Sequence, residues 1–128
     1  MKKIKKENNG RDFAVFIGVG QEPIIISIYK TTEGDENEGS FAKSIKALIG
    51  GHFQCLTIAA DYDCVGYVGM WVDDEGLIKH LPLNKKASKF AKTGIVGNVL
   101  ITGDVDDEGN TLLLTSEEAL KIIKIMEM

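Results

Sequence analysis

Residues 65–80, VGYVGMWVDDEGLIKH, contain the pattern that decides the fold class. Their first half alternates as a β-strand does: Val68, Met70 and Val72 fall on one face, while Trp71 lies on the other. Successive side chains of a strand point to opposite faces, so this stretch predicts a strand over 65–72.

The second half of the stretch predicts that the chain turns back on itself. Residues 73–76, Asp-Asp-Glu-Gly, predict a tight hairpin turn, because Gly76 can adopt positive φ. A short returning strand is expected over 77–80. Pro82 ends this strand, since proline has no N–H to donate to the sheet. The stretch therefore predicts antiparallel pairing.

The rest of the chain supplies further strands and two helices. Further strands are predicted at 13–19, 24–29, 53–58, 95–102 and 112–114. An apolar stripe predicts a helix over 40–49, stopped by Gly50 and Gly51. Thr115 and Glu118 have the spacing of a capping box that begins a C-terminal helix. The expected fold is α+β, with a mostly antiparallel sheet of about six short strands, one short internal helix and a C-terminal helix.

The length of 128 residues fits a single domain. Residues 1–12 are polar and lysine-rich, and we expect them to form a flexible N-terminal tail. Residues 13–128 then form one α+β domain. The polar start resembles no signal peptide, and no apolar run approaches the roughly 18 residues of a membrane span. We therefore expect a cytoplasmic protein with no membrane partner.

Charge and cysteine content narrow the function classes. The net charge of -4 disfavours binding to a nucleic-acid polymer. The two cysteines, Cys55 and Cys64, form neither a Cys-x-x-C pair nor a Cys/His cluster, so no structural zinc is expected.

No catalytic or metal motif is complete. Residues 104–110, DVDDEGN, place carboxylates as a calcium loop does, but Thr115 stands where a bidentate glutamate is needed. His52 and Cys55 would point to opposite faces of a strand, which is the wrong geometry for a base and its nucleophile. Gly18-x-Gly20 lacks the third glycine of a dinucleotide fingerprint. We therefore expect no catalytic residue, no metal and no cofactor, and a protein that is not an enzyme.

Residues 81–86, LPLNKK, and the single tryptophan provide candidate ligand contacts. Trp71 could stack on a nucleobase, although packing in the core or at its rim is the plainer interpretation. Asn84 could read polar edges of a ligand, or it could cap the following turn. Lys85 and Lys86 could meet a phosphate.

Four short motifs share a recognisable order. They are IGGHF (49–53), WVDDEG (71–76), LPLN (81–84) and IVGNV (95–99). This order resembles a phage- and mobile-element-associated family of small proteins that is described as a domain of unknown function. The resemblance covers nearly the whole chain from Phe13 and departs from it in the acidic stretch at 32–39. It implies a phage origin and, by analogy, a role against host defence.

The leading hypothesis is a non-enzymatic protein that sequesters a small nucleotide-derived molecule, as a homo-oligomer. Its expected ligand-binding residues are Trp71, Asn84, Lys85, Lys86, Gly50, Gly51 and His80. The alternative is a protein–protein interaction module that inhibits or adapts a host or phage protein, with acidic loops that steer a basic partner. A third hypothesis is a nucleotide hydrolase that uses His52 or His80.

Overall fold

A five-stranded antiparallel sheet forms the centre of the molecule. The computed structural model describes residues 11–28, 40–60, 66–105 and 111–127. The strands are β1 (Phe13–Ile17), β2 (Ile24–Ser27), β3 (Phe53–Ala60), β4 (Gly66–Asp73) and β5 (Val99–Gly103), in the spatial order β2-β1-β5-β4-β3. The α+β class and the antiparallel sheet are confirmed, with five strands among the described residues where about six were expected.

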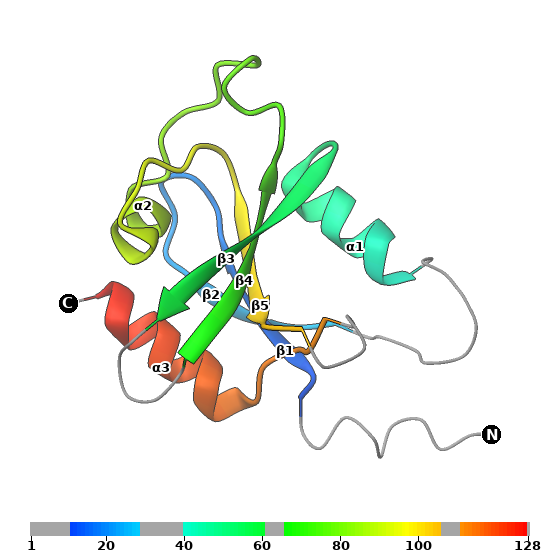
Figure 1. Ribbon diagram of the computed structural model, residues 1–128, viewed down its shortest axis with the longest axis vertical. Helices are drawn as coiled ribbons and strands as arrows, with labels where there is room; N and C mark the ends of the chain where they lie inside the picture. The colour runs from blue at the N-terminus through cyan, green and yellow to red at the C-terminus, as the bar shows by residue number, and fades with distance from the viewer. Residues whose placement is uncertain (1–10, 29–39, 61–65, 106–110, 128) are drawn as a thin grey trace.

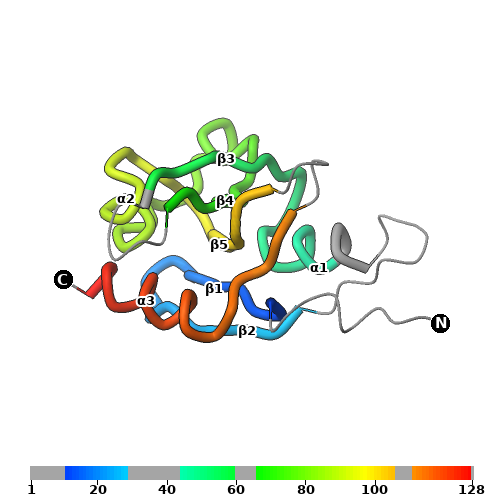
Figure 2. Tube along the Cα trace, turned by 60° about the horizontal axis from the view of Figure 1, so that its bottom comes forward, coloured from blue at the N-terminus to red at the C-terminus, as the bar shows by residue number. Residues whose placement is uncertain are grey.

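Three helices cover the two faces of this sheet. Helix α1 (Ser40–Ile49) lies on one face, and α2 (Lys85–Ala91) and α3 (Ser116–Met126) lie on the other (Figure 1). Figure 2 shows the sheet from another side, with β3 near one end and β2 near the other. The internal helix α1 and the C-terminal helix α3 were predicted, whereas α2 is additional to the two expected helices.

The sheet is buried on both faces along its middle strand. In β5, Leu100 packs toward α1 and Ile101 packs toward α2 and α3, and both are fully buried. The predicted alternation of β4 is also confirmed, because Val68, Met70 and Val72 all lie in the core beneath α2 and α3. The sequence period of two therefore gives a separate core to each face.

Residues 74–80 form no returning strand. Lys79 N donates to the backbone oxygen of Glu75 at 2.9 Å, and Leu81 N donates to that of Gly76 at 3.0 Å. Because these bonds join residues four or five apart, the segment coils into successive turns. The strand predicted at 112–114 is likewise reduced to an isolated bridge between Phe13 and Leu114.

The first described residues are tied to the last helix. Arg11 donates to the carboxylate of Glu118 at 2.7 and 3.4 Å and to the backbone oxygen of Leu113 at 3.2 Å. Glu118 also completes the predicted capping box with Thr115. Ile28 N donates to the backbone oxygen of Asp12 at 2.9 Å, so Arg11 and Asp12, which we expected in the tail, both contact the rest of the described fold. Residues 1–10 lie outside the described part. No helix in the described part is long and apolar enough to span a bilayer.

Candidate functional site

The sheet separates the predicted ligand-binding residues into two groups. Trp71, Gly50 and Gly51 belong to the side of the sheet that carries α1. Asn84, Lys85 and Lys86 begin α2, which packs on the opposite face. The structure therefore does not bring the tryptophan and the lysines together around one concave surface of this chain.

Asn84 is enclosed by backbone. The residue is only 1% exposed. Its side-chain Nδ2 donates to the backbone oxygens of Ile17 at 3.0 Å and Gly97 at 2.9 Å. Oδ1 accepts from Ala87 N at 3.2 Å, which caps α2. Both amide hydrogens are used, so Asn84 holds the structure and does not reach a ligand on the surface.

Trp71 is likewise occupied by packing. Its ring meets that of Phe53 edge to face, with 5.6 Å between the centroids. Its Nε1 donates to Oγ1 of the fully buried Thr102 at 3.0 Å. An edge-to-face aromatic pair with its polar atom satisfied is typical of a core rim.

The remaining predicted residues are more accessible but dispersed. Lys85 and His80 are exposed, and His80 has a φ of 59°. Lys86 Nζ lies 3.7 Å from Glu22 Oε1. Gly50 ends α1 with a φ of 98°, and Gly51 packs so closely against the segment after β4 that a Cβ there would lie 2.7 Å from Lys79 Nζ.

The four sequence motifs meet at one end of the molecule. There they support residues 74–82, which we name the β4–α2 loop and which projects at the top of Figure 1. Asp74 N donates to the oxygen of His52 at 3.1 Å, and Gly97 N donates to that of Pro82 at 2.9 Å. A Cβ on Gly97 would lie 2.9 Å from Leu81 Cδ1. Backbone from all four motifs therefore fixes the shape of this loop.

A buried carboxylate braces the loop from within. Asp73 Oδ1 accepts from Glu75 N at 2.8 Å, and Oδ2 accepts from Lys79 Nζ at 2.7 Å. The Asp73 side chain is 2% exposed. The hydrogen bond from Lys79 outweighs the opposing effect of burial, so the pKa of Asp73 is lowered from its ordinary value.

The braced loop exposes two adjacent apolar side chains to solvent. Leu77 and Ile78 are each 79% exposed. Asp74 and Glu75, which precede them, are exposed as well. We name Leu77 and Ile78 the apolar tip. Sequence reasoning missed it because both residues were placed in a strand. Their adjacency was a usable signal, because two adjacent residues of a strand point to opposite faces and cannot both pack into one core.

The brace predicts an acid-sensitive component of stability. The folded pKa of Asp73 is lowered, so the unfolded chain binds the proton more tightly, and stability is lost as pH falls below about 4. Asp73→Asn removes this component. Unfolding in urea from pH 7 to pH 2 should show a smaller loss of stability for the variant than for the parent. An equal loss of stability in the variant and the parent between pH 7 and pH 2 would contradict the role assigned to Asp73.

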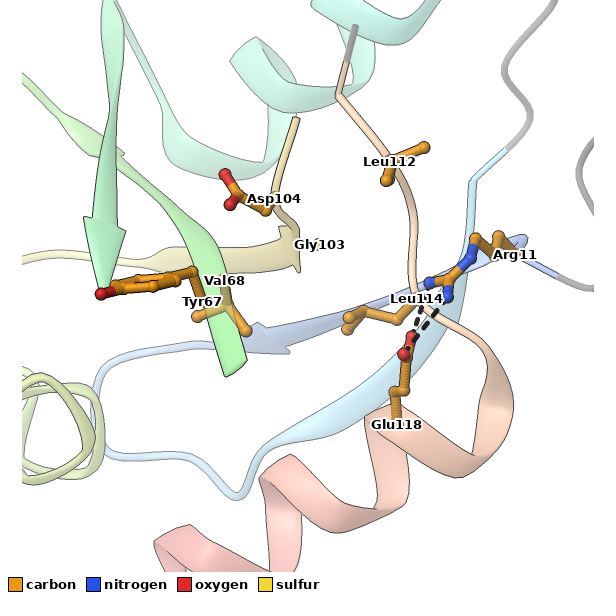
Figure 3. A pocket seen from close by; sticks show the side chains of 8 residues that line it. All are labelled: Arg11, Tyr67, Val68, Gly103, Asp104, Leu112, Leu114 and Glu118. Atoms are coloured by element: carbon orange, nitrogen blue, oxygen red, sulfur yellow. Dashed lines mark hydrogen bonds and ion pairs between the residues drawn. The ribbon is translucent and has the colours of Figure 1, made fainter. Parts of the chain in front are cut away.

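A pocket lies at the end of β4 and β5 away from the β4–α2 loop. Figure 3 shows a pocket of about 160 Å³ whose lining includes Arg11, Tyr67, Asp104 and Glu118. The Arg11 guanidinium is already paired with Glu118. Ligand pockets for drug-sized molecules usually measure roughly 300–1,000 Å³, so this one is small for a nucleotide.

The thiol of Cys55 is not activated. Partial burial, and then the charge of Asp104, raise the pKa of Cys55. A nucleophilic cysteine needs a lowered pKa, so the geometry does not favour thiol catalysis here. The described residues contain no cluster of three metal-ligating side chains. Most of the acidic 104–110 stretch lies outside them.

Comparison with known proteins places the chain in a family. Residues 14–127 match the family described as "Domain of unknown function (DUF3846)". No curated protein and no solved structure matches the chain. The match spans nearly the whole sequence and includes the four motifs that support the β4–α2 loop. The chain therefore belongs to this domain family of unknown function.

Proposed function

We propose that this protein is a non-enzymatic interaction module that docks its apolar tip into a pocket of another protein. The observation that carries the proposal is the 79% exposure of both Leu77 and Ile78 on a loop that is fixed from below. Single exposed apolar residues are common on proteins, but two adjacent ones on a hydrogen-bonded projection offer a partner one continuous apolar surface to bury.

Rigidity is what makes the tip suited to binding. The Asp73 carboxylate holds Glu75 and Lys79 on either side of the tip. Ordering a loop on binding costs free energy, and a loop that is already ordered avoids that cost. Asp74 and Glu75 lie exposed beside the tip, so the preferred partner has an apolar pocket with a basic rim.

The rival proposal, sequestration of a nucleotide-derived molecule, finds less support in this chain. Trp71 and the Lys85–Lys86 pair lie on different sides of the sheet, and Asn84 is buried. A second subunit would have to complete any such site. The phage or mobile-element origin, and an action against host defence, belong to the proposal on the strength of the sequence resemblance alone.

The tip can be tested with a photo-reactive phenylalanine analogue at position 77 in producing cells. We expect one discrete protein adduct from position 77 and none from position 120, where Leu120 of α3 is 59% exposed. Once the partner is purified, Ile78→Asp should weaken its binding about thirtyfold or more, as loss of a central anchor does. Leu120→Asp should leave it unchanged.

Two outcomes would overturn the proposal. One is equal crosslinking from positions 77 and 120, which would show a general surface stickiness. The other is calorimetric binding of a cyclic nucleotide that persists in a Leu77→Asp, Ile78→Asp double variant, together with no protein adduct. That result would favour the sequestration proposal.

A further inference from the structure

Among the residues that the structure describes, β3 is an edge strand, and its own sequence lacks the usual features that protect an edge against pairing. It lies at the end of the strand order and spans eight residues, FQCLTIAA. These residues include no charge and no proline. Natural edge strands are commonly short, or carry lysine, proline or a bulge, because an open edge pairs with other chains. The other edge, β2, has four residues and directly follows Pro23.

The register shows which backbone groups face outward. Asp74 N donates to the oxygen of His52, just before β3, at 3.1 Å. In an antiparallel ladder every second residue directs both its N–H and C=O to the same neighbour. The even-numbered residues of β3 therefore bond β4. Phe53, Cys55, Thr57 and Ala59 direct their backbone groups away from it.

We propose that β3 pairs with β3 of a second copy of this chain, across a two-fold axis perpendicular to the sheet. This axis makes the strands antiparallel and keeps α1 of both copies on the same side. Side chains alternate between the two faces of the sheet, so an even-numbered residue can lie opposite only an even-numbered one, and an odd-numbered residue opposite only an odd-numbered one. A closed two-fold pair covers the β3 edge of both copies and leaves only the two short β2 edges at the ends of the joined sheet.

The sequence of β3 is self-complementary with Thr57 on the axis. Leu56 then lies opposite Ile58, and both are half-buried apolar residues beside the core under α2 and α3. On the other face Cys55 lies opposite Ala59, and both are small and exposed. Thr57 would exchange backbone hydrogen bonds with its own copy. The strand carries no charge, so it neither repels a second copy nor attracts a charged peptide.

The neighbouring surface supports the same partner. Tyr67 pairs with Ala59 in the β3–β4 ladder and is 61% exposed. It therefore places an aromatic side chain beside Cys55, Thr57 and Ala59 on the face that carries α1, and it shares a pocket with Asp104. A second copy approaching this edge would bring an identical apolar and hydroxyl-bearing surface against it.

Sedimentation velocity on the full chain tests the proposal. The parent should sediment as a dimer, at twice its 14.0 kDa mass. Thr57→Lys should be monomeric at the same concentration, because it sets two like-charged side chains directly opposite each other, on Cα atoms about 5.5 Å apart. Thr57→Val should remain a dimer. Ser27→Lys, which adds the same charge to the exposed end of β2, should also remain a dimer.

Amide hydrogen exchange keeps the test decisive if Thr57→Lys folds poorly. In the parent, the amides of Cys55, Thr57 and Ala59 should be protected at high concentration and exchange faster on dilution. A parent chain that is monomeric at its highest soluble concentration would overturn the proposal. So would a dimer that Ser27→Lys dissociates and Thr57→Lys does not. Protection of these amides only after another protein is added would assign the edge to a foreign strand.

Discussion

Replacing Asn84 with alanine is expected to lower the free energy of unfolding by about 3–5 kcal/mol. The change leaves the backbone oxygens of Ile17 and Gly97 and the amide of Ala87 without their side-chain partner. Each buried polar group left unpaired costs roughly 1–3 kcal/mol. A domain of this size is stable by only about 5–15 kcal/mol, so the loss is a large fraction. Urea unfolding followed by circular dichroism measures it.

Two comparison variants separate the cap from the rest of the network. Thr115→Ala removes the N-cap of α3 and should cost about 1 kcal/mol. Asn84→Asp keeps the acceptor for Ala87 but loses both donated hydrogen bonds, so it should be at least as damaging as Asn84→Ala. If Asn84→Ala costs no more than Thr115→Ala, the bonds to Ile17 and Gly97 contribute little and the role assigned to this residue is wrong.

The second large effect is expected in the middle strand. Leu100→Ala and Ile101→Ala should each lower the free energy of unfolding by about 3 kcal/mol, because each side chain is fully buried on a different face. Leu120→Ala, at an exposed position of α3, should change it by less than about 0.5 kcal/mol. Chemical denaturation measures all three. A small effect of Leu100→Ala alone would mean that α1 does not cover a true core.

Much of the fold follows from the sequence because local patterns decided it. The alternation in 65–72 and the Thr115–Glu118 pair depend on neighbours a few residues away, and both predictions are confirmed. The segment at 95–102 was placed as one strand, but β5 begins only at Val99. Gly97, with a φ of 81°, interrupts it, and its backbone instead holds Asn84 and Pro82. That contact spans two segments, which no local pattern reveals.

The candidate site was less accessible to sequence reasoning. Asp73 and Gly76 have the composition of a hairpin turn, and the following Leu77 and Ile78 have that of a strand. What prevents the hairpin is the capture of Lys79 by Asp73 and the contact of Gly76 with Val96, where a Cβ would lie 2.8 Å away. The first contact joins residues six apart, and the second joins segments twenty residues apart, so neither shows in the two-residue period of a strand. The predicted ligand-binding residues do not converge in this chain, because the sheet separates residues such as Trp71 and Lys85, which belong to opposite faces.

The strand order has a consequence for synthesis on the ribosome. The hairpins β1–β2 and β3–β4 are each made of neighbouring strands, but only β5 lies between β1 and β4. The chain emerges N-terminus first, so the residues of both hairpins leave the exit tunnel before the strand that joins them. Until Val99–Gly103 clears it, Val15 and Met70 lack the shared core that later buries them. During synthesis the β1–β2 and β3–β4 segments are therefore outside the ribosome for a time without the central strand that joins them.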